Sequence, residues 1–160
     1  MVILLMGVTG SGKTTVGKAL AESLHWLFAD ADDFHPPSNV AKMRAGIPLN
    51  DADRAPWLAA LRTQIDEWLH AGANAVLACS ALKESYRQKL VVTSDVPVVY
   101  LRGSRELIAE RLKERHGHYM DPNLLPSQFA TLEEPQGALV VDVDASVAEI
   151  VSRIRKGVGV

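Results

Sequence analysis

Short apolar segments alternate with amphipathic segments along most of this 160-residue chain. Several apolar segments are rich in β-branched residues and apolar without interruption, which is typical of buried parallel strands. They span residues 2–6, 26–29, 75–79, 96–101 and 139–143. In the segments between them, apolar residues recur every three or four positions, which predicts helices. These helices span residues 13–24, 58–69, 84–91, 105–115 and 147–155.

The alternation of strands and helices predicts an α/β protein with a parallel sheet covered by helices on both faces. The length fits a single domain of residues 1–160. Residues 31–56 and 116–137 do not fit the alternation and are rich in Pro, His, Asp and Asn. Long loops inside a compact domain are usually functional, so we expect substrate contacts in these two segments.

Charge and cysteine content narrow the class of protein. The net charge of −2 and the pI near 6.2 provide no basic field, which argues against a partner that is a nucleic acid or an anionic membrane. The single cysteine, Cys79, excludes an internal disulfide and favours a reducing compartment, so we expect a cytoplasmic protein. The first residues lead directly into an apolar strand, and we expect no signal peptide and no membrane span.

The sequence GVTGSGKT at residues 7–14 predicts a phosphate-binding loop, because it lies between an apolar strand and a helix. Backbone N–H groups at the start of that helix would surround a β-phosphate, and Lys13 would reach the β- and γ-oxygens. The Thr14 hydroxyl would bind Mg²⁺. The predicted nucleotide-binding residues are Gly7, Val8, Thr9, Gly10, Ser11, Gly12, Lys13, Thr14 and Thr15.

Three acids follow the second predicted strand, and they favour a small-molecule kinase. No Asn-Lys-x-Asp string is present, which argues against a GTPase, and the third strand does not end in an acid as a motor or ATPase strand usually does. Asp30 and Asp32 lie two residues apart at a strand end, so both carboxylates should point towards the mouth of the sheet. Asp30 would serve the metal through water, and Asp32 would take a proton from an incoming hydroxyl. For Asp33 we favour solvation or helix capping.

Several motifs together resemble the gluconokinase family. They are GVTGSGKT, DADDFHPPSNVAKMRAGIPLNDADRAPWL, CSALKESYRQKL, ERLKERHGHYM and LLPSQFATLEEP, in this order over nearly the whole chain. The resemblance implies a P-loop kinase fold with a five-stranded parallel sheet, a substrate-binding insertion at about 31–56 and a lid at about 116–137. It also implies transfer of the ATP γ-phosphate to the 6-hydroxyl of D-gluconate with Mg²⁺, in a cytoplasmic homodimer that feeds gluconate into carbohydrate metabolism.

The resemblance places an acceptor site in the insertion. Asp32 is similar to the family acid that orients or deprotonates the acceptor hydroxyl, and His35, Lys42, Arg44 and Arg54 lie in the substrate-side motif. Arginine suits the gluconate carboxylate because its planar fork binds carboxylates bidentately. From charge alone, Arg54 could equally pair with Asp51 or Asp53, and Lys42 and Arg44 could be ordinary solvated residues. We expect His35 to bind a polyol hydroxyl, since no second His or Cys lies at metal spacing.

Further candidates lie after the third strand and near the lid. Ser80 and Arg87 could reach the mouth of the sheet, or could instead cap a helix and form a surface ion pair. Arg115 is predicted to contact the transferring phosphate and Arg111 the adenine or α-phosphate, unless both only pair with neighbouring glutamates. Gln128 would tie the lid to the site.

The remaining predictions concern packing and the alternatives for function. Trp57 and Trp68 recur at helical spacing with leucines, which favours core packing over sugar stacking. Residues 38–46 predict a short helix that Ser38 or Asn39 caps and Gly46 ends. The alternatives to a gluconokinase are a kinase of another small hydroxy acid, such as shikimate, and a non-catalytic nucleotide-binding module.

Overall fold

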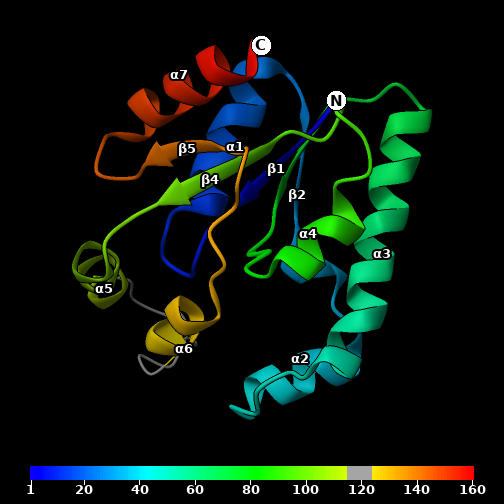
Figure 1. Cartoon of the computed structure of the whole chain (residues 1–160), viewed down its shortest axis with the longest axis vertical. Coiled ribbons are helices and arrows are strands. Elements are labelled where there is room, and N and C mark those ends of the chain that lie inside the picture. The colour runs from blue at the N-terminus through cyan, green and yellow to red at the C-terminus, as the bar shows by residue number, and fades with distance from the viewer. Residues whose placement is uncertain (115–123) are drawn as a thin grey trace.

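The computed structural model describes residues 1–114 and 124–160, which form a parallel sheet between two layers of helices (Figure 1). Within these residues the sheet has five strands in the order β2-β3-β1-β4-β5. The strands are β1 (Val2–Met6), β2 (Leu27–Asp30), β3 (Ala75–Ala78), β4 (Val98–Arg102) and β5 (Leu139–Asp142). Every neighbouring pair is parallel, which confirms the predicted α/β class.

Helices lie between these strands and after the last one, and they include two that the alternation did not provide for. They are α1 (Lys13–Leu24), α2 (Pro37–Arg44), α3 (Asp51–His70), α4 (Glu84–Leu90), α5 (Arg105–Lys113), α6 (Leu124–Thr131) and α7 (Val147–Val158). A 3₁₀ helix, η1 (Ala31–Phe34), follows β2 directly. None of the helices in the described residues is long and apolar enough to cross a membrane.

Strand β1 is the centre of the core, and its residues alternate between two hydrophobic clusters. Ile3 and Leu5 face the layer formed by α1 and α7, together with residues such as Leu20 and Ile154. Val2, Leu4 and Met6 face the layer formed by α3 and α4, with residues such as Leu61, Ile65 and Leu90. Because helices cover both faces, β1 is apolar at every position and completely buried, as predicted.

Strand β2 differs from the prediction. It begins one residue later than expected and forms an edge of the sheet, so Leu27 is 52% exposed instead of buried. Strand β4 also begins later, at Val98, because Val96 N–H donates to Thr93 O in a turn before the strand. The apolar segments thus located both strands. They did not show that β2 lies at an edge of the sheet, or that the first residues of the second segment form a turn before β4 begins.

The segment between β2 and β3 is more helical than expected. Helix α2 begins after Pro36, and neither predicted cap is correct, because Ser38 and Asn39 both lie inside its first turn. Gly46 follows this helix with φ +72°, in the left-handed region. Helix α3 begins seven residues before Leu58, where Asn50 and Asp53 form a capping box.

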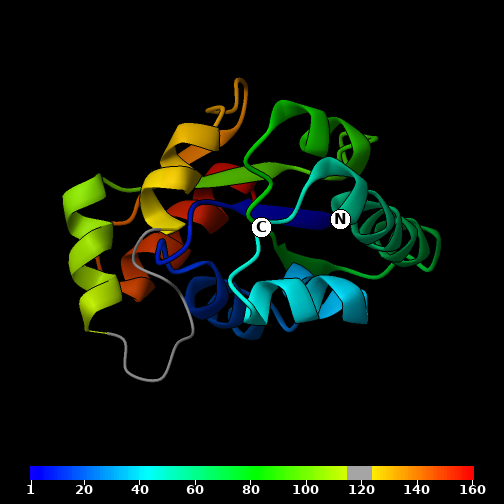
Figure 2. The ribbon, with the colours of Figure 1, turned by 90° about the horizontal axis from the view of Figure 1, so that it is seen from below.

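Helices α2, α5 and α6 lie together at the end of the molecule opposite the two termini (Figure 1). The view onto this end shows α5 and α6 on one side and α2 on the other, with the loop after β1 between them (Figure 2). Ligands of open parallel sheets bind outside the carboxyl ends of the strands, at the point where the strand order reverses. Here the order reverses at β1, from which the chain leaves into the predicted phosphate loop.

Candidate functional site

The loop between β1 and α1 has a backbone that only glycine permits. Gly10 and Gly12 adopt φ values of +78° and +97°, in the left-handed region. A Cβ atom on Gly10 would lie 2.9 Å from the Leu112 side chain, and one on Gly7 would lie 2.6 Å from Ser11 Oγ. Among the described residues, Ser11 Oγ is a buried polar atom without a hydrogen-bond partner. Such a closely packed loop at a helix N-terminus fits a phosphate cradle.

The Lys13 side chain lies across this loop. Its Nζ donates hydrogen bonds to Gly7 O at 2.9 Å and to Val8 O at 3.0 Å. The ammonium therefore sits beside the N–H groups at the start of α1, where both favour an anion. Contact of Lys13 with the β- and γ-phosphates stays a prediction.

Two oxygen ligands suited to Mg²⁺ lie next to each other beside the loop. Thr14 Oγ1 donates to Asp30 Oδ2 at 2.8 Å, which brings a hydroxyl and a carboxylate together. The described residues contain no group of three or more His, Cys, Asp or Glu side chains that could hold a metal ion. A site of two protein oxygens fits Mg²⁺, because this ion keeps several waters and takes further ligands from nucleotide phosphates.

Asp30 also positions Asp32, although not by the predicted strand alternation. Only Asp30 belongs to β2, and its Oδ1 accepts a hydrogen bond of 3.0 Å from Asp32 N–H at the start of η1. The 3₁₀ turn thus places Asp32 beside the metal-side carboxylate. A chain of hydrogen bonds runs from Thr14 in the phosphate loop through Asp30 to Asp32.

The carboxyl group of Asp32 has a raised pKa. Surrounding protein atoms that exclude water contribute most, the charges of Asp30 and Asp33 raise the pKa further, and the Lys13 ammonium lowers it. The side chain itself is 82% exposed, so the crowding comes from one side only and the remaining water weakens each contribution. Asp32 thus lies within the electrostatic influence of Lys13 in the phosphate loop and of the neighbouring acids.

His35 is held firmly next to Asp32. Its ring stacks on Trp57 with centroids 4.4 Å apart and an interplanar angle of 11°. Its Nδ1 lies 3.2 Å from Asn39 Nδ2, and its Nε2 lies 4.0 Å from Asp32 Oδ1. Trp57 Nε1 donates to Ala31 O at 2.7 Å, so the indole joins α3 to η1. Trp57 belongs to the core, as predicted, and also supports His35 and η1.

Arg54 lies at the junction of α3 and α4. Its Nη1 donates to Tyr86 Oη at 3.2 Å and lies 3.7 Å from Asp51 Oδ1, while its guanidinium lies over the Tyr86 ring. Tyr86 Oη donates to the same Asp51 oxygen at 3.0 Å, and Lys83 Nζ lies 3.8 Å from it. The structure therefore provides the Asp51 partner that charge alone suggested, but Asp51 is exposed and engages only part of the guanidinium fork. Binding of an acceptor carboxylate by Arg54 stays a prediction.

Two other cations of the insertion have different surroundings. Lys42 Nζ donates to both carboxylate oxygens of Asp53 at 2.9 Å, which ties α2 to the first turn of α3. The hydrogen bond from the backbone of Asn50 contributes most to lowering the pKa of the Asp53 carboxyl, and the hydrogen bond from the Lys42 ammonium contributes next. Arg44 lies exposed in the last turn of α2. Lys42 thus joins two helices, whereas Arg44 has no hydrogen-bond or ion-pair partner within residues 1–114 and 124–160.

The surroundings of Arg87 argue against its predicted substrate contact, which stays untested. The side chain is 3% exposed, and all five N–H donors of its guanidinium are engaged within the protein. Nη1 donates to Ala81 O and Leu82 O, Nη2 donates to Glu133 O and Glu84, and Nε donates to Glu84. Arg87 therefore joins α4 to the loop after β3 and to the segment after α6.

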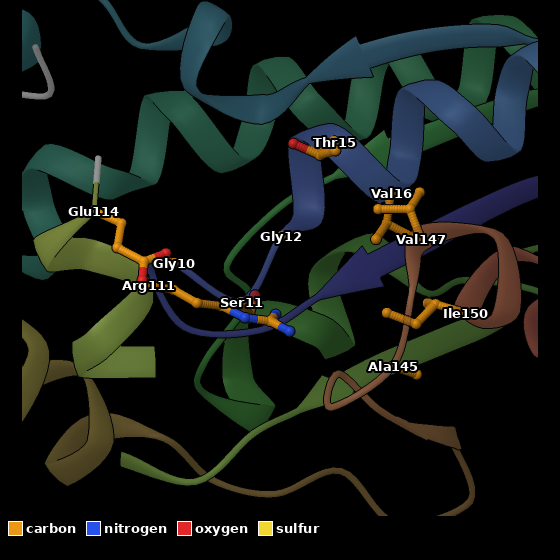
Figure 3. A pocket seen from close by; sticks show the side chains of 10 residues that line it. All are labelled: Gly10, Ser11, Gly12, Thr15, Val16, Arg111, Glu114, Ala145, Val147 and Ile150. Atoms are coloured by element: carbon orange, nitrogen blue, oxygen red, sulfur yellow. The ribbon is translucent and has the colours of Figure 1, made fainter. Parts of the chain in front are cut away.

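Ser80 and Arg111 are two further candidates from the sequence, and only Arg111 lines a cavity beside the phosphate loop. Ser80 is half-buried after β3 and does not cap α4, whose N-cap residue is Lys83. Arg111 Nη2 donates to Val143 O at 2.5 Å. Arg111 and Ser11 both line a cavity of about 290 Å³ (Figure 3). The cavity is lined by Gly10, Ser11, Gly12, Thr15, Val16, Arg111, Glu114, Ala145, Val147 and Ile150.

The predicted lid is described only in part. Arg115, expected at the transferring phosphate, lies outside the described residues, as does the segment 116–123. Within α6, Gln128 Oε1 accepts a hydrogen bond of 2.6 Å from Thr9 N–H in the phosphate loop. The expected tie between Gln128 and the site is thus present.

Sequence reasoning missed Asn39 and Tyr86, which support the candidate acceptor residues His35 and Arg54. Asn39 is 1% exposed, although asparagine usually lies at the surface. Its position four residues after His35 on a predicted helix was the available signal. No sequence signal related Tyr86 to Arg54, because 32 residues separate them.

Comparisons with known proteins agree on one group of enzymes. The family description "Shikimate kinase" matches residues 9–156. A gluconokinase of Gluconobacter oxydans is 52% identical over 135 residues, covering 83% of this chain and 75% of its own. A probable gluconokinase of Xenopus tropicalis is 45% identical, covering 96% of this chain and 91% of its own. The solved structure of a gluconokinase from Sinorhizobium meliloti is 46% identical with a TM-score of 0.87, covering 98% of this chain and 90% of that one.

Proposed function

The chain belongs to the gluconokinase family within the shikimate kinase group, and from this we propose that it phosphorylates D-gluconate at the 6-hydroxyl. ATP is the proposed phosphate donor, and 6-phospho-D-gluconate and ADP are the products. One observation carries the proposal beyond the family: hydrogen bonds connect Thr14 of the phosphate loop through Asp30 to Asp32. A candidate base for an acceptor hydroxyl therefore lies beside the loop that would hold the donor phosphates.

The phosphate loop and the residues beside it would bind the nucleotide and the metal. The loop of residues 7–14 would bind the phosphates through its backbone N–H groups and Lys13. The cavity beside Arg111 and Ile150 suits the base and ribose, since it adjoins the phosphate loop. Thr14 and, through water, Asp30 would hold Mg²⁺, which supplies positive charge for the β- and γ-oxygens.

The acceptor would lie between η1, α2 and the start of α3. Asp32 would orient its hydroxyl and take the proton, while Arg54 would bind the carboxylate. Arg54 retains N–H donors that Tyr86 and Asp51 do not engage, and Tyr86 holds its guanidinium in place. Phosphoryl transfer needs little covalent chemistry from the protein, so positioning and charge neutralisation would account for most of the catalysis.

The test is the variant Asp32→Asn, measured beside Asp33→Asn. We expect kcat with gluconate to fall by about 10² to 10⁴-fold in the first variant, because an amide cannot accept the proton. The affinity for ATP should stay nearly unchanged. Asp33→Asn is the matched control, because it removes a neighbouring charge from the same turn. Normal turnover of Asp32→Asn would remove Asp32 from this role.

A coupled assay of ADP release across gluconate, shikimate and nucleoside monophosphates tests the acceptor. Release that depends on shikimate would favour the alternative hydroxy acid, and no acceptor-dependent release would favour a nucleotide-binding module. Omission of Mg²⁺ in the same assay tests the metal. The homodimer and the cytoplasmic location are further parts of the proposal; light scattering during gel filtration and fractionation of cells test them.

A further inference from the structure

The hydrogen bond between Asn39 and His35 determines which ring nitrogen of His35 carries the proton. Asn39 Nδ2 lies 3.2 Å from His35 Nδ1. An amide nitrogen only donates hydrogen bonds, so Nδ1 must accept and cannot itself carry a proton. In a neutral imidazole the proton must then reside on Nε2.

A second hydrogen bond fixes the orientation of the Asn39 amide. Asn39 Nδ2 also donates to Asp53 O at 2.8 Å, and the side chain is 1% exposed. If the amide were reversed, its Oδ1 would face the Asp53 carbonyl oxygen, and two acceptors would be buried against each other. The α3 backbone therefore selects the amide orientation, and the amide selects the tautomer of His35.

The His35 ring can neither turn away nor readily become charged. It stacks on Trp57, and its side chain is 5% exposed. Burial lowers the pKa of His35, and the positive charge of Arg54 lowers it further, which favours the neutral ring. Nε2–H therefore stays directed towards the side of the ring where Asp32 lies.

His35 Nε2 and Asp32 Oδ1 are close enough for one hydroxyl group to contact both. Nε2 lies 4.0 Å from Asp32 Oδ1, which is too far for a direct hydrogen bond. An oxygen about 2.8 Å from each atom would lie about 2 Å to one side of the line that joins them, within hydrogen-bond distance of both. That oxygen would accept from Nε2–H and donate its own proton to the carboxylate.

We propose that Asn39 is a positioning residue that keeps His35 as an Nε2–H donor, so that His35 and Asp32 together hold the acceptor's reacting hydroxyl. The donor binds a lone pair of the hydroxyl oxygen, and the carboxylate binds its proton. This inference rests on the proposed function for the identity of the acceptor. The tautomer of His35 is a property of the protein without acceptor.

The tautomer is measured by two-bond ¹H–¹⁵N correlation spectra of the imidazole rings in the full-length protein at neutral pH. The chain has five histidines, and loss of one ring pattern in His35→Phe identifies that of His35. We expect the pattern of a neutral ring protonated at Nε2. A ring protonated at Nδ1, or at both nitrogens, would overturn the proposal whether or not the protein phosphorylates gluconate.

Binding measurements test the hydroxyl contact. His35→Phe keeps a ring to stack on Trp57 but removes the donor, and it should weaken gluconate binding by about fivefold to tenfold while ATP binding is unchanged. The 6-deoxy analogue of gluconate should bind equally to both proteins, since it lacks the proposed hydroxyl. An equal loss for the two ligands would refute the contact. His70→Phe, at the far end of α3, is the matched control and should change neither affinity.

Asn39→Leu tests the positioning role itself. We expect the His35 spectrum to show some Nδ1–H tautomer and gluconate affinity to fall, with ATP affinity retained. A variant that is only less stable, with tautomer and affinity unchanged, would contradict the proposal. If Asn39→Leu does not fold, the wild-type spectrum and the two-ligand comparison decide. A wild-type protein that binds no gluconate overturns the proposed function, and the spectrum alone then decides the role of Asn39.

Discussion

Replacement of Arg87 by methionine should destabilise the protein without weakening the binding of the acceptor. The variant keeps an unbranched, apolar side chain in a site that is 3% exposed, but it removes all five guanidinium donors. Three backbone carbonyls then lose their charged partner, those of Ala81, Leu82 and Glu133. Leu82 O keeps its hydrogen bond from Glu133 N–H, so two carbonyls are left unpaired. At about 1 kcal/mol for each of these two, the free energy of unfolding should fall by about 2 kcal/mol. Glu84 is 56% exposed, so water can replace the guanidinium as its partner, and loss of this ion pair adds little to the destabilisation.

Urea denaturation followed by circular dichroism measures this change as a lower midpoint with an unchanged slope. The matched control is Arg62→Met, which removes an exposed ion pair with Asp66 and an exposed hydrogen bond to Lys89 O. Water can replace both, so the variant should cost less than about 1 kcal/mol. The Michaelis constant for gluconate should be the same in both variants. If Arg87→Met kept wild-type stability and raised that constant, Arg87 would be a substrate residue and the structural reasoning would be refuted.

Three further predictions follow from the site. Arg54→Ala should raise the Michaelis constant for gluconate by about tenfold to a hundredfold with kcat less affected, because a charged hydrogen bond to the carboxylate is lost; an unchanged constant would remove Arg54 from the pocket. Gly10→Ala should weaken ATP binding, since its Cβ would lie 2.9 Å from Leu112, whereas Gly72→Ala, with a similar φ of +68° but open space, should only cost about 1 kcal/mol of stability. Folding lowers the pKa of His35, so just below pH 6.5 the unfolded chain binds more protons than the folded protein. The free energy of unfolding should therefore decrease there as the pH falls, by at most about 1.4 kcal/mol per pH unit for one group. Denaturation of His35→Phe between pH 5.5 and 7.5 checks this, and an unchanged pH dependence would contradict it.

The sequence predicted the parts of the site that short-range chemistry determines. The phosphate loop needs its glycines, Lys13 and Thr14 within eight residues, so the string itself carries the geometry. The acids after β2 were found for the same reason, although a 3₁₀ turn, and not strand alternation, brings Asp32 to Asp30.

Contacts over long sequence distances could not be predicted in this way. Arg87 matched a motif and lay after a strand end, but the partners that engage it include Glu133, which is 46 residues away. Tyr86 and Arg54 are related only because α4 packs on α3. The pattern of apolar residues predicts that such helices pack, but it does not say which polar groups meet at their ends.

The stacked pair of Trp57 and His35 gives the acceptor site an optical reporter. Indole fluorescence responds to a neighbouring imidazole and to its protonation, and the two rings are 4.4 Å apart. Trp57 is one of three tryptophans, and its indole N–H donates to the carbonyl oxygen of Ala31, the residue before Asp32. Any ligand that displaces η1 or alters His35 must therefore change the environment of an emitting side chain. If the acceptor binds at His35 and Asp32 as proposed, we expect its binding to change indole emission, which can be followed without coupling to ADP release and without an added label.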